Sequence, residues 1–270
     1  AENLVEWVRT WVTFPCSMVD RITPRTSEEL QGEVDALFGP SPFIPVMAED
    51  FTQWVVDDHF AAERPDLTKV GVTFTKNVDP YEEAKIRILN GGHTCLAYLG
   101  ALAGHHTFDQ AMADPELFAH FEEFERGEVL PALIEALPFD KNIYLDQIIV
   151  RFKNASIGDT VERICADGYL KFPIFIHPTL AGCLKQGILP RAGLRAIASW
   201  YVFCKHIEAG TLPITYEEPY WENLRELLQD GQVDRFAQSA SLWGTLPQDH
   251  SEFMPALIAA ITEMEKKWPV

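Results

Sequence analysis

The stretch Lys85–Gly100 reads KIRILNGGHTCLAYLG and lies at the start of a part of the sequence that is typical of helical proteins. Its two consecutive glycines, Gly91 and Gly92, would each cost roughly 1 kcal/mol inside a helix. They therefore indicate either a break in the helix or a place where a ligand or another backbone comes very close. An apolar face is supplied by Ile88, Leu89, Leu96 and Leu99.

The polar residues of this stretch fall on one side of the predicted helix. At about 100° per residue, Lys85, His93 and Asn90 project at about 0°, 80° and 140° on the helical wheel. Such a group suits the oxidation of a secondary alcohol, in which a lysine takes the hydroxyl proton while Asn and His hold the developing alkoxide. A lysine in this role must be largely neutral near neutral pH, which burial and nearby cations promote. The alternative is an amphipathic helix with a solvated Lys85 and a packed His93.

Two domains are predicted, because the type of secondary structure that the sequence favours changes along the chain. Residues 80–270 form one helical candidate after another, separated by prolines. Residues 1–79 are mixed: Val70–Thr75 alternates as a strand does, Phe43–Met47 is an edge-strand candidate, and Phe51–Phe60 is predicted to be helical. These strands are too few for a sheet of their own, so the segment is expected to complete a sheet elsewhere. The predicted fold class is mainly α, with a small α/β segment in front.

The composition limits the classes of function. Hydrophobic residues make up 47% of the 270 residues, which favours a globular protein over disorder. A formal net charge of −18 argues against nucleic-acid binding, which requires Lys and Arg to contact phosphates. No apolar run is long enough to span a membrane. The five cysteines are scattered without a CxxC pair, as expected of buried residues in a reducing cytosol, so a cytoplasmic location is predicted.

Charged residues in two further stretches are candidates for binding a substrate. Asp20 and Arg21 lie in the otherwise apolar stretch Phe14–Pro24, where charges are expected to pair with each other or to face a site. Arg163 and Lys171 could reach a polyhydroxylated or carboxylated ligand. The alternatives are a structural Asp–Arg pair in the first stretch and solvated surface cations in the second.

The sequence contains no known phosphate-binding or nucleophile motif. Neither GxGxxG, GxxxxGK[ST] nor GxSxG occurs, so the chain has no recognisable loop for the phosphates of a cofactor. His105, His106 and Asp109 lie close together, but their spacing matches no zinc motif, and no metal site is predicted.

Three stretches together resemble the mannitol dehydrogenase family, the long-chain polyol and sugar-acid dehydrogenases. They are TFPCSMVDRITP (Thr13–Pro24), KIRILNGGHTCLAYLG (Lys85–Gly100) and RFKNASIGDTVERICADGYLKFP (Arg151–Pro173). Their order and separation match the family, and the resemblance runs from about Val5 to at least Pro178.

This resemblance implies an activity and a set of site residues. The implied reaction is a metal-independent hydride transfer between NAD(H) and C2 or C5 of a hexitol or hexonate. The family's Lys-x4-Asn-x2-His helix falls on Lys85, Asn90 and His93, with Lys85 as the general base. The family's substrate contacts fall on Val19, Asp20, Arg163 and Lys171.

The chain also departs from the family pattern. Members resemble a chain of nearly twice this length with an N-terminal Rossmann domain, which carries the cofactor and a second Asn of the oxyanion hole. Residues 1–79 are therefore expected to complete a missing Rossmann domain, present in cis or as a separate chain. The cofactor is expected to be NAD, with NADP left open, and the cofactor-binding residues are unknown.

The substrate and the class of function have alternatives. Polyol-oxidising members often have Asn where this chain has Cys16, and the Cys form is closer to fructuronate reductases, which interconvert D-mannonate and D-fructuronate. A different class is a non-catalytic helical module that binds a sugar acid without turnover. An upstream nucleotide-binding domain would favour the enzyme.

Overall fold

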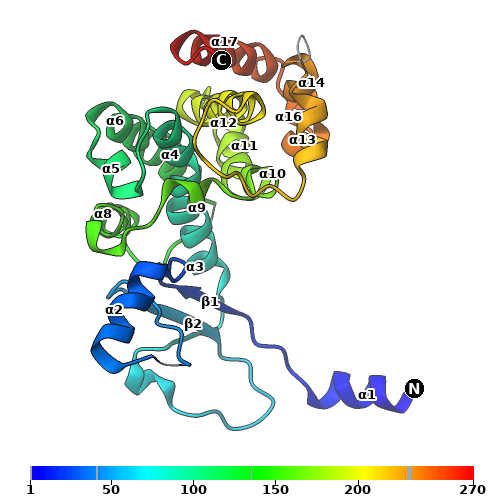
Figure 1. The fold of residues 1–270 in the computed structure, drawn as a ribbon. Coiled ribbons are helices and arrows are strands. Elements are labelled where there is room, and N and C mark those ends of the chain that lie inside the picture. The colour runs from blue at the N-terminus through cyan, green and yellow to red at the C-terminus, as the bar shows by residue number, and fades with distance from the viewer. Residues whose placement is uncertain (1, 41, 135, 230–232) are drawn as a thin grey trace. The chain divides into compact units, whose positions relative to one another are not determined.

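The computed structural model describes residues 2–40, 42–134, 136–229 and 233–270, and the chain divides into two compact units. The first unit comprises residues 1–83 and the second comprises residues 84–270. Figure 1 shows that the first contains a small sheet with helices and that the second is built from helices.

The first unit is organised around a three-stranded sheet. The central strand β2 is antiparallel to β1 and parallel to β3. Met18 of β1 pairs with Val55 of β2, and both pack with Val78 and Tyr81 in a small core. The elements are α1 (Glu2–Trp11), β1 (Ser17–Asp20), α2 (Glu28–Phe38), β2 (Gln53–Asp57), the 3-10 turn η1 (Leu67–Val70), β3 (Thr73–Thr75) and α3 (Asp79–Ala84).

Three sequence-based expectations for this unit were wrong. Gln53–Asp57 is a strand, although Phe51–Phe60 was predicted to be helical; a short apolar run fits either structure, and pairing with two neighbours decides it here. Phe43–Met47 is not a strand. Residues 1–79 also form a sheet of their own, because β2, which was not predicted to be a strand, pairs with both β1 and Thr73–Thr75.

The sequence also predicts a helix start at Ser27, which is a residue type that caps helices and is followed by Glu28 and Glu29, and the structure confirms it. The side chain of Ser27 accepts a hydrogen bond from the backbone N–H of Leu30 at 3.1 Å, which makes it the N-cap of α2. Glu28 and Glu29 lie in the first turn, where the helix dipole favours anions.

The second unit is built around the helix α4, which packs against α6, α9 and α12, while α17 packs along α12 (Figure 1). Its elements are η2 (Lys85–Asn90), α4 (Gly91–Leu102), α5 (Phe108–Ala113), α6 (Pro115–Phe124), η3 (Glu125–Val129), α7 (Leu130–Ala132), α8 (Lys141–Phe152), η4 (Ala155–Ile157), α9 (Val161–Cys165), α10 (Gly168–Lys171), η5 (Phe172–Ile176), α11 (His177–Lys185), α12 (Arg191–Ala209), α13 (Trp221–Leu227), α14 (Val233–Gln238), α15 (Ala240–Trp243), α16 (Leu246–Asp249) and α17 (Phe253–Lys267).

The central position of α4 follows from its sequence. Every residue of this helix is buried except His93, as expected of a helix that is apolar on all sides. Small residues allow neighbours to come close: a Cβ on Gly100 would lie 3.1 Å from the Cβ of Ala111. The helix therefore offers one polar side chain at its first turn and otherwise serves as core.

The predicted burial of the cysteines is confirmed for four of the five. Cys95, Cys165, Cys183 and Cys204 are buried and Cys16 is exposed, and all of them are free thiols. Within the described ranges, no helix combines the length and the apolar character needed to cross a membrane.

Candidate active site

The helical stretch formed by α3, η2 and α4 contains a π-helical turn at its centre. The segment η2, Lys85–Asn90, joins α3 to α4, and the N–H of Gly91 donates to the carbonyl of Ile86, five residues earlier. π-Helical turns inside α-helices are frequent at functional sites. The turn also alters the projection expected for a regular α-helix, so the angles between Lys85, Asn90 and His93 differ from those on the wheel.

The two glycines mark close approaches and not a break in the helix. A Cβ on Gly91 would lie 3.2 Å from the carbonyl oxygen of Phe175. A Cβ on Gly92 would lie 2.8 Å from both Glu125 Oε1 and Phe121 Cε2, closer than real Cβ contacts come. The predicted close approach of another backbone is confirmed at Gly91, whereas at Gly92 the groups that come close are side chains.

His93 is held between aromatic rings at the start of α4. Its imidazole stacks on Phe152, with ring centroids 4.1 Å apart and an angle of 24° between the planes. Phe108 meets it edge-on, with centroids 4.7 Å apart. The ring is therefore fixed by packing, and its side chain remains half-buried, as the only residue of α4 that is not fully enclosed.

Burial and nearby cations keep His93 neutral. Burial lowers the pKa of the imidazole well below its ordinary value of 6.5, and the positive charges of Arg163, Lys171, Arg151 and Lys85 lower it further. The structure thus places three predicted residues, Lys85, Arg163 and Lys171, close enough for their charges to act on His93. Arg151 is not among the predicted site residues, although it begins the third matching stretch.

Asn90 ends η2 with an unsatisfied polar atom. Its side-chain oxygen Oδ1 is buried and has no hydrogen-bond partner among the described residues. Its backbone carbonyl accepts a hydrogen bond from Thr94 Oγ1 at 2.9 Å. Buried polar atoms are nearly always paired, so an orphaned amide oxygen three residues before His93 in the chain indicates a position where a ligand or water binds.

Arg163 is paired by a neighbouring carboxylate. Its Nε donates to Asp159 Oδ1 at 2.5 Å, and a second hydrogen bond joins the same two side chains. Asp159 is buried, whereas Arg163 is partly exposed, so the guanidinium is held at the surface of the site. Asp159 and Thr160 are residue types that the sequence predicts to cap a helix, and Thr160 does cap α9 by accepting from the N–H of Arg163.

Lys171 is the last residue of α10 and is partly buried. Its Nζ donates to the carbonyl of Ile164 at 2.8 Å. Burial lowers the pKa of Lys171 below its ordinary value of 10.5, and the carboxylate of Asp167 acts in the opposite direction. The predicted alternative of a solvated surface cation does not describe this side chain.

A buried network that was not predicted supports the turn before Lys171. Glu218 accepts hydrogen bonds from the N–H of Tyr169 at 2.9 Å and from the hydroxyl of Tyr216 at 2.9 Å. Only a glycine fits at 168, since a Cβ there would lie 2.5 Å from Trp200 Nε1. Asp167 takes a left-handed conformation with φ 58°. No local sequence signal reveals Glu218, because its partner Tyr169 lies far away in the chain.

The two remaining predicted contacts, Val19 and Asp20, belong to the first unit. Both lie on β1, where Asp20 is buried and Val19 is exposed. The adjacent Arg21 donates from Nε to the carbonyl of Glu49 at 2.8 Å. Their part in a site stays a prediction.

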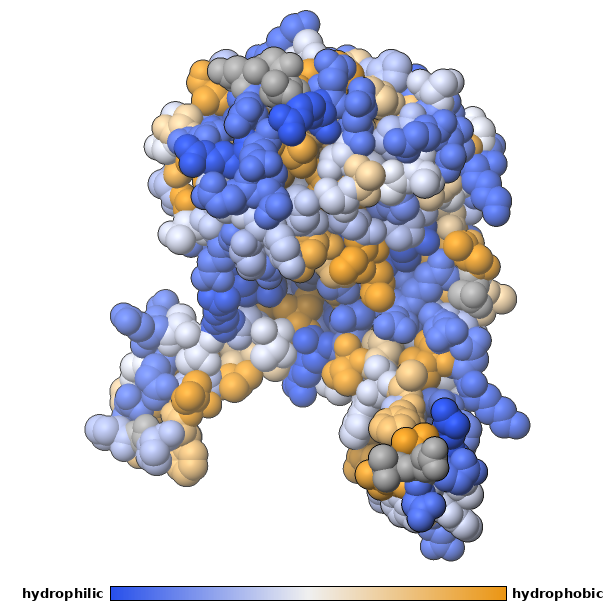
Figure 2. All heavy atoms as spheres, turned by 90° about the vertical axis from the view of Figure 1, so that its right-hand side faces the viewer, coloured by the Kyte–Doolittle hydropathy of each residue, from blue (hydrophilic) through white to orange (hydrophobic). Residues whose placement is uncertain are grey.

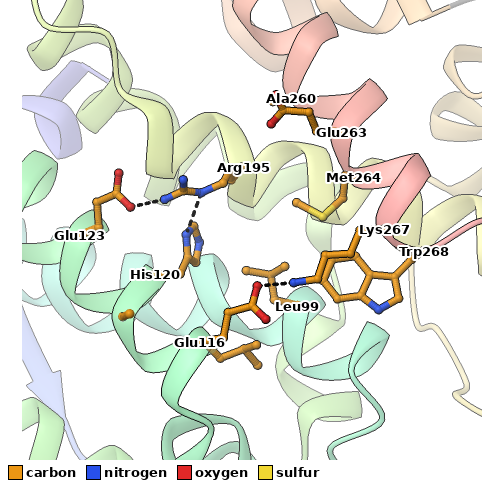
Figure 3. A pocket seen from close by; sticks show the side chains of 12 residues that line it. Leu99, Glu116, His120, Glu123, Arg195, Ala260, Glu263, Met264, Lys267 and Trp268 are labelled. Carbon is orange, nitrogen blue, oxygen red and sulfur yellow. Dashed lines mark hydrogen bonds and ion pairs between the residues drawn. The ribbon is translucent and has the colours of Figure 1, made fainter.

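A separate cavity of about 320 Å³ opens between α4, α6, α12 and α17, and Figure 3 shows its lining. Arg195 donates to His120 Nδ1 at 3.3 Å and pairs with Glu123, while Lys267 pairs with Glu116 (Figure 3). The predicted site residues are not among those that line it. Four of its charged side chains, Glu116, Glu123, Arg195 and Lys267, already pair with one another, and none of the predicted site residues faces it, so this cavity is not the candidate active site.

Family models decide the identity of the chain. Residues 77–265 match the model described as the mannitol dehydrogenase C-terminal domain, and residues 1–69 match the mannitol dehydrogenase Rossmann domain. The chain belongs to the mannitol dehydrogenase family. The resemblance of the three sequence stretches is thereby confirmed, as is the mainly helical fold preceded by an α/β segment.

Relatives in this family are named for the oxidation of polyols. The chain is 36% identical to D-arabinitol 4-dehydrogenase of Klebsiella pneumoniae, over 96% of its own length and 58% of the relative's. It is 40% identical to mannitol 2-dehydrogenase of Cereibacter sphaeroides, over 95% of its own length and 55% of the relative's. The chain therefore spans just over half the length of these mannitol dehydrogenase family members.

A solved structure of the family has the same fold. Mannitol 2-dehydrogenase of Pseudomonas fluorescens, in a ternary complex with NAD and D-mannitol, matches with a TM-score of 0.88 and 33% identity. The match covers 98% of this chain and 55% of the other. One expectation needs correction: residues 1–69 themselves match the Rossmann domain, so part of that domain lies within this chain.

Among the described residues, no group of three or more His, Cys, Asp or Glu side chains is arranged to hold a metal ion. The side chains that act on His93 are instead cations and aromatic rings.

Proposed function

We propose that this chain supplies the substrate-binding and catalytic side of an NAD-dependent polyol dehydrogenase. The reaction would be hydride transfer between the cofactor and a secondary alcohol of a polyol. The observation that carries the proposal is the π-helical turn η2, which joins Lys85 and Asn90 to a neutral His93 within a member of the mannitol dehydrogenase family.

The side chains have complementary parts in this reaction. Bound NAD would supply the acceptor for the hydride that leaves the alcohol carbon. Lys85 takes the hydroxyl proton as general base. The amide of Asn90 donates to the oxygen, and a neutral His93 retains one N–H for the same purpose. The positive charges around His93 favour the negative charge that develops on the oxygen.

The dinucleotide would be bound by additional protein. The described residues of the first unit form a three-stranded sheet, and the sequence has no glycine-rich loop for the phosphates of NAD. Large hydrophobic side chains of residues 1–83 are exposed, among them Trp11, Phe14 and Phe38, and Figure 2 shows hydrophobic groups on an otherwise largely hydrophilic surface. We therefore propose that a further nucleotide-binding segment, in cis or as a separate chain, covers the exposed hydrophobic side chains of residues 1–83.

A neutral polyol is the proposed substrate, with a hexonate as the second candidate. Arg163 is already neutralised by its two hydrogen bonds to Asp159, which leaves it less suited to bind a carboxylate. Lys171 still places a positive charge near His93, and this observation favours the hexonate. The relatives named above act, by their names, on arabinitol and mannitol.

The substrate is decided by turnover in a protein that carries the nucleotide-binding segment. NADH formation from D-mannitol, D-arabinitol and D-mannonate is followed side by side. We expect the two neutral polyols to be oxidised. Turnover of D-mannonate alone would make the protein a fructuronate reductase type, with Lys171 as the first carboxylate contact to test. Binding of a sugar acid without any turnover would favour the non-catalytic module.

The role of Lys85 is tested by Lys85→Ala in the same protein. Because the general base would be lost, kcat should fall by about a hundredfold or more. Lys185→Ala removes an exposed lysine at the end of α11 and is the matched control, which should keep full activity. Unchanged kcat in Lys85→Ala would refute the assignment of the base.

A further inference from the structure

Glu125 is a buried carboxyl group for which the proposed reaction has no use. It is fully enclosed, and neither carboxyl oxygen has a hydrogen-bond partner among the described residues. It begins the π-helical turn η3, which packs against η2. A carboxylate without a partner is very unfavourable in such a place, so the group takes up a proton and becomes neutral.

The carboxyl group lies directly against the backbone that precedes His93. Glu125 Oε1 is 2.8 Å from the position that a Cβ on Gly92 would take. Phe121 Cε2 is 2.8 Å and Phe152 Cε2 is 3.3 Å from the same point. Three side chains thus meet where Gly92 has none, and the glycine is what allows the contact.

These contacts lead to the imidazole of His93. Phe152, which shares the space at Gly92, is also the ring on which His93 stacks at 4.1 Å. Phe108 completes the enclosure: it meets Phe152 edge-on at 5.0 Å and His93 at 4.7 Å. A change in the length of the side chain at 125 would therefore alter the support behind His93.

We propose that Glu125 is a positioning residue that, as a neutral carboxylic acid, fixes Gly92 and the ring of Phe152 and through them the imidazole of His93. The meaning of this for catalysis rests on the proposed function, whereas the positioning itself does not. The shape and length of the side chain carry the effect, and its charge does not.

The surrounding charges agree with a neutral Glu125. Burial raises the pKa of this carboxyl well above its ordinary value of 4.5, against the charges of Arg87 and Arg126. A neutral group adds no negative charge near His93, whose own pKa must stay low for the ring to remain neutral. The titratable groups on the elements packed against η3 are Lys85 and Arg87 on η2, Glu116, His120, Glu122 and Glu123 on α6, and His177, Cys183 and Lys185 on α11, while α7 has none.

Two variants separate length from chemistry. Glu125→Gln keeps the length and shape of the neutral acid, whereas Glu125→Asp keeps the acid but shortens it by one methylene. Glu263→Ala removes an exposed carboxylate of α17 and is the control. The readout is the set of imidazole resonances of His93 in histidine-labelled protein, assigned by their loss in His93→Gln, because the stacked ring of Phe152 shifts them.

The proposal predicts opposite outcomes for the two variants. Glu125→Gln and the control should keep the His93 resonances in place, and Glu125→Asp should move them. If Glu125→Gln moves them while Glu125→Asp does not, the charge matters and the proposal is overturned. Unmoved resonances in both variants would also overturn it. Thermal unfolding of each variant verifies that the compared proteins are folded.

Activity gives the second readout, in the protein that carries the nucleotide-binding segment. Glu125→Asp should lower kcat by about tenfold or more with little change in KM, and Glu125→Gln should keep kcat within about twofold of the parent. Equal kcat in both variants would overturn the link to catalysis. If the parent protein oxidises no polyol, the proposed function fails, and the resonances of His93 still decide the role of Glu125.

Discussion

Gly92 has no room for even a methyl group, and this single residue connects α4 to the side chains behind it. Its missing Cβ would overlap with Glu125 and Phe121. Two adjacent glycines could be recognised in the sequence as a place of close approach. The groups that approach could not, because they come from α6, η3 and α8, which are separated from Gly92 in the chain.

Gly92→Ala should therefore destabilise the second unit by about 1–3 kcal/mol, since an added methyl group forces well-packed neighbours apart. Urea unfolding measures the change. Gly127→Ala is the control, because nothing lies within 4 Å of a Cβ at that position. Equal stability of Gly92→Ala and Gly127→Ala would show that the contacts at Gly92 yield without cost.

His120 shows how a histidine can be wholly structural. Arg195 Nε donates to its Nδ1, so the remaining proton of the neutral ring is assigned to Nε2, which faces Cys95 Sγ at 3.2 Å. Burial first, and then the charge of Arg195, lower the pKa of His120 from 6.5 to about 3. Its contribution to stability is thus present above pH 6.5 and is lost as the pH falls toward 3.

Replacing His120 tests the direction of this pH dependence of stability. His120→Asn has no group that protonates in this range, so we expect the loss of stability between about pH 6.5 and pH 3 to become shallower than in the parent protein. Thermal unfolding across this range measures it. An identical acid profile would mean that other groups, such as His93, dominate acid unfolding.

At the scale of elements, the first turn of the long helix α12 donates hydrogen bonds to a carboxylate of η3. Glu128 accepts hydrogen bonds from the N–H groups of Ala192 at 2.7 Å and Gly193 at 2.8 Å, and so satisfies two donors that a helix start leaves open. Burial outweighs these bonds and raises the pKa of Glu128 from 4.5 to about 7. Its stabilising contribution is therefore complete below pH 4.5 and is lost as the pH rises through 7.

Glu128→Gln should cost about 1–3 kcal/mol, because the amide NH2 cannot accept a hydrogen bond and leaves one buried N–H unpaired. The variant should also lose the decline in stability between pH 4.5 and 7. Denaturant unfolding at several pH values measures both. The exposed Glu226→Gln is the control. An unchanged pH slope in Glu128→Gln would contradict the raised pKa.

Elements also show what the sequence could and could not predict. The helix through Lys85–Gly100 and the caps Ser27 and Thr160 follow from local patterns, and the structure confirms them. The π-helical turn could not be predicted, because helical periodicity assumes regular spacing. Strand β2 was mistaken for a helix, since pairing with β1 and β3 decides a short apolar run.

The candidate site shows the same division. Lys85, Asn90 and His93 stand close together in the sequence, so their grouping was visible there. Arg163 and Lys171 were expected from the resemblance, and their charges do act on His93. The supports Glu125 and Glu218 were missed because a contact between distant segments leaves no local pattern.

At the scale of the whole molecule, the exposed apolar side chains of α1 determine how the protein behaves alone. Trp7 and Trp11 are 55% and 65% exposed. We expect the chain to self-associate without the proposed nucleotide-binding segment, and Trp7→Glu with Trp11→Glu to reduce this association. Sedimentation velocity measures it. A compact monomer over a wide concentration range in the parent protein would contradict the expectation.

The cations around His93 stand in a protein whose formal net charge is −18. The negative net charge of the protein would first repel an anionic sugar that approaches from solvent. The cations around His93 would attract the sugar only once it is within a Debye length of them, which is about 10 Å at 0.1 M salt. Added salt would then speed the capture of a hexonate and leave that of a neutral polyol unaffected. The ionic-strength dependence of kcat/KM would therefore distinguish the two substrates by how they arrive, before either is turned over.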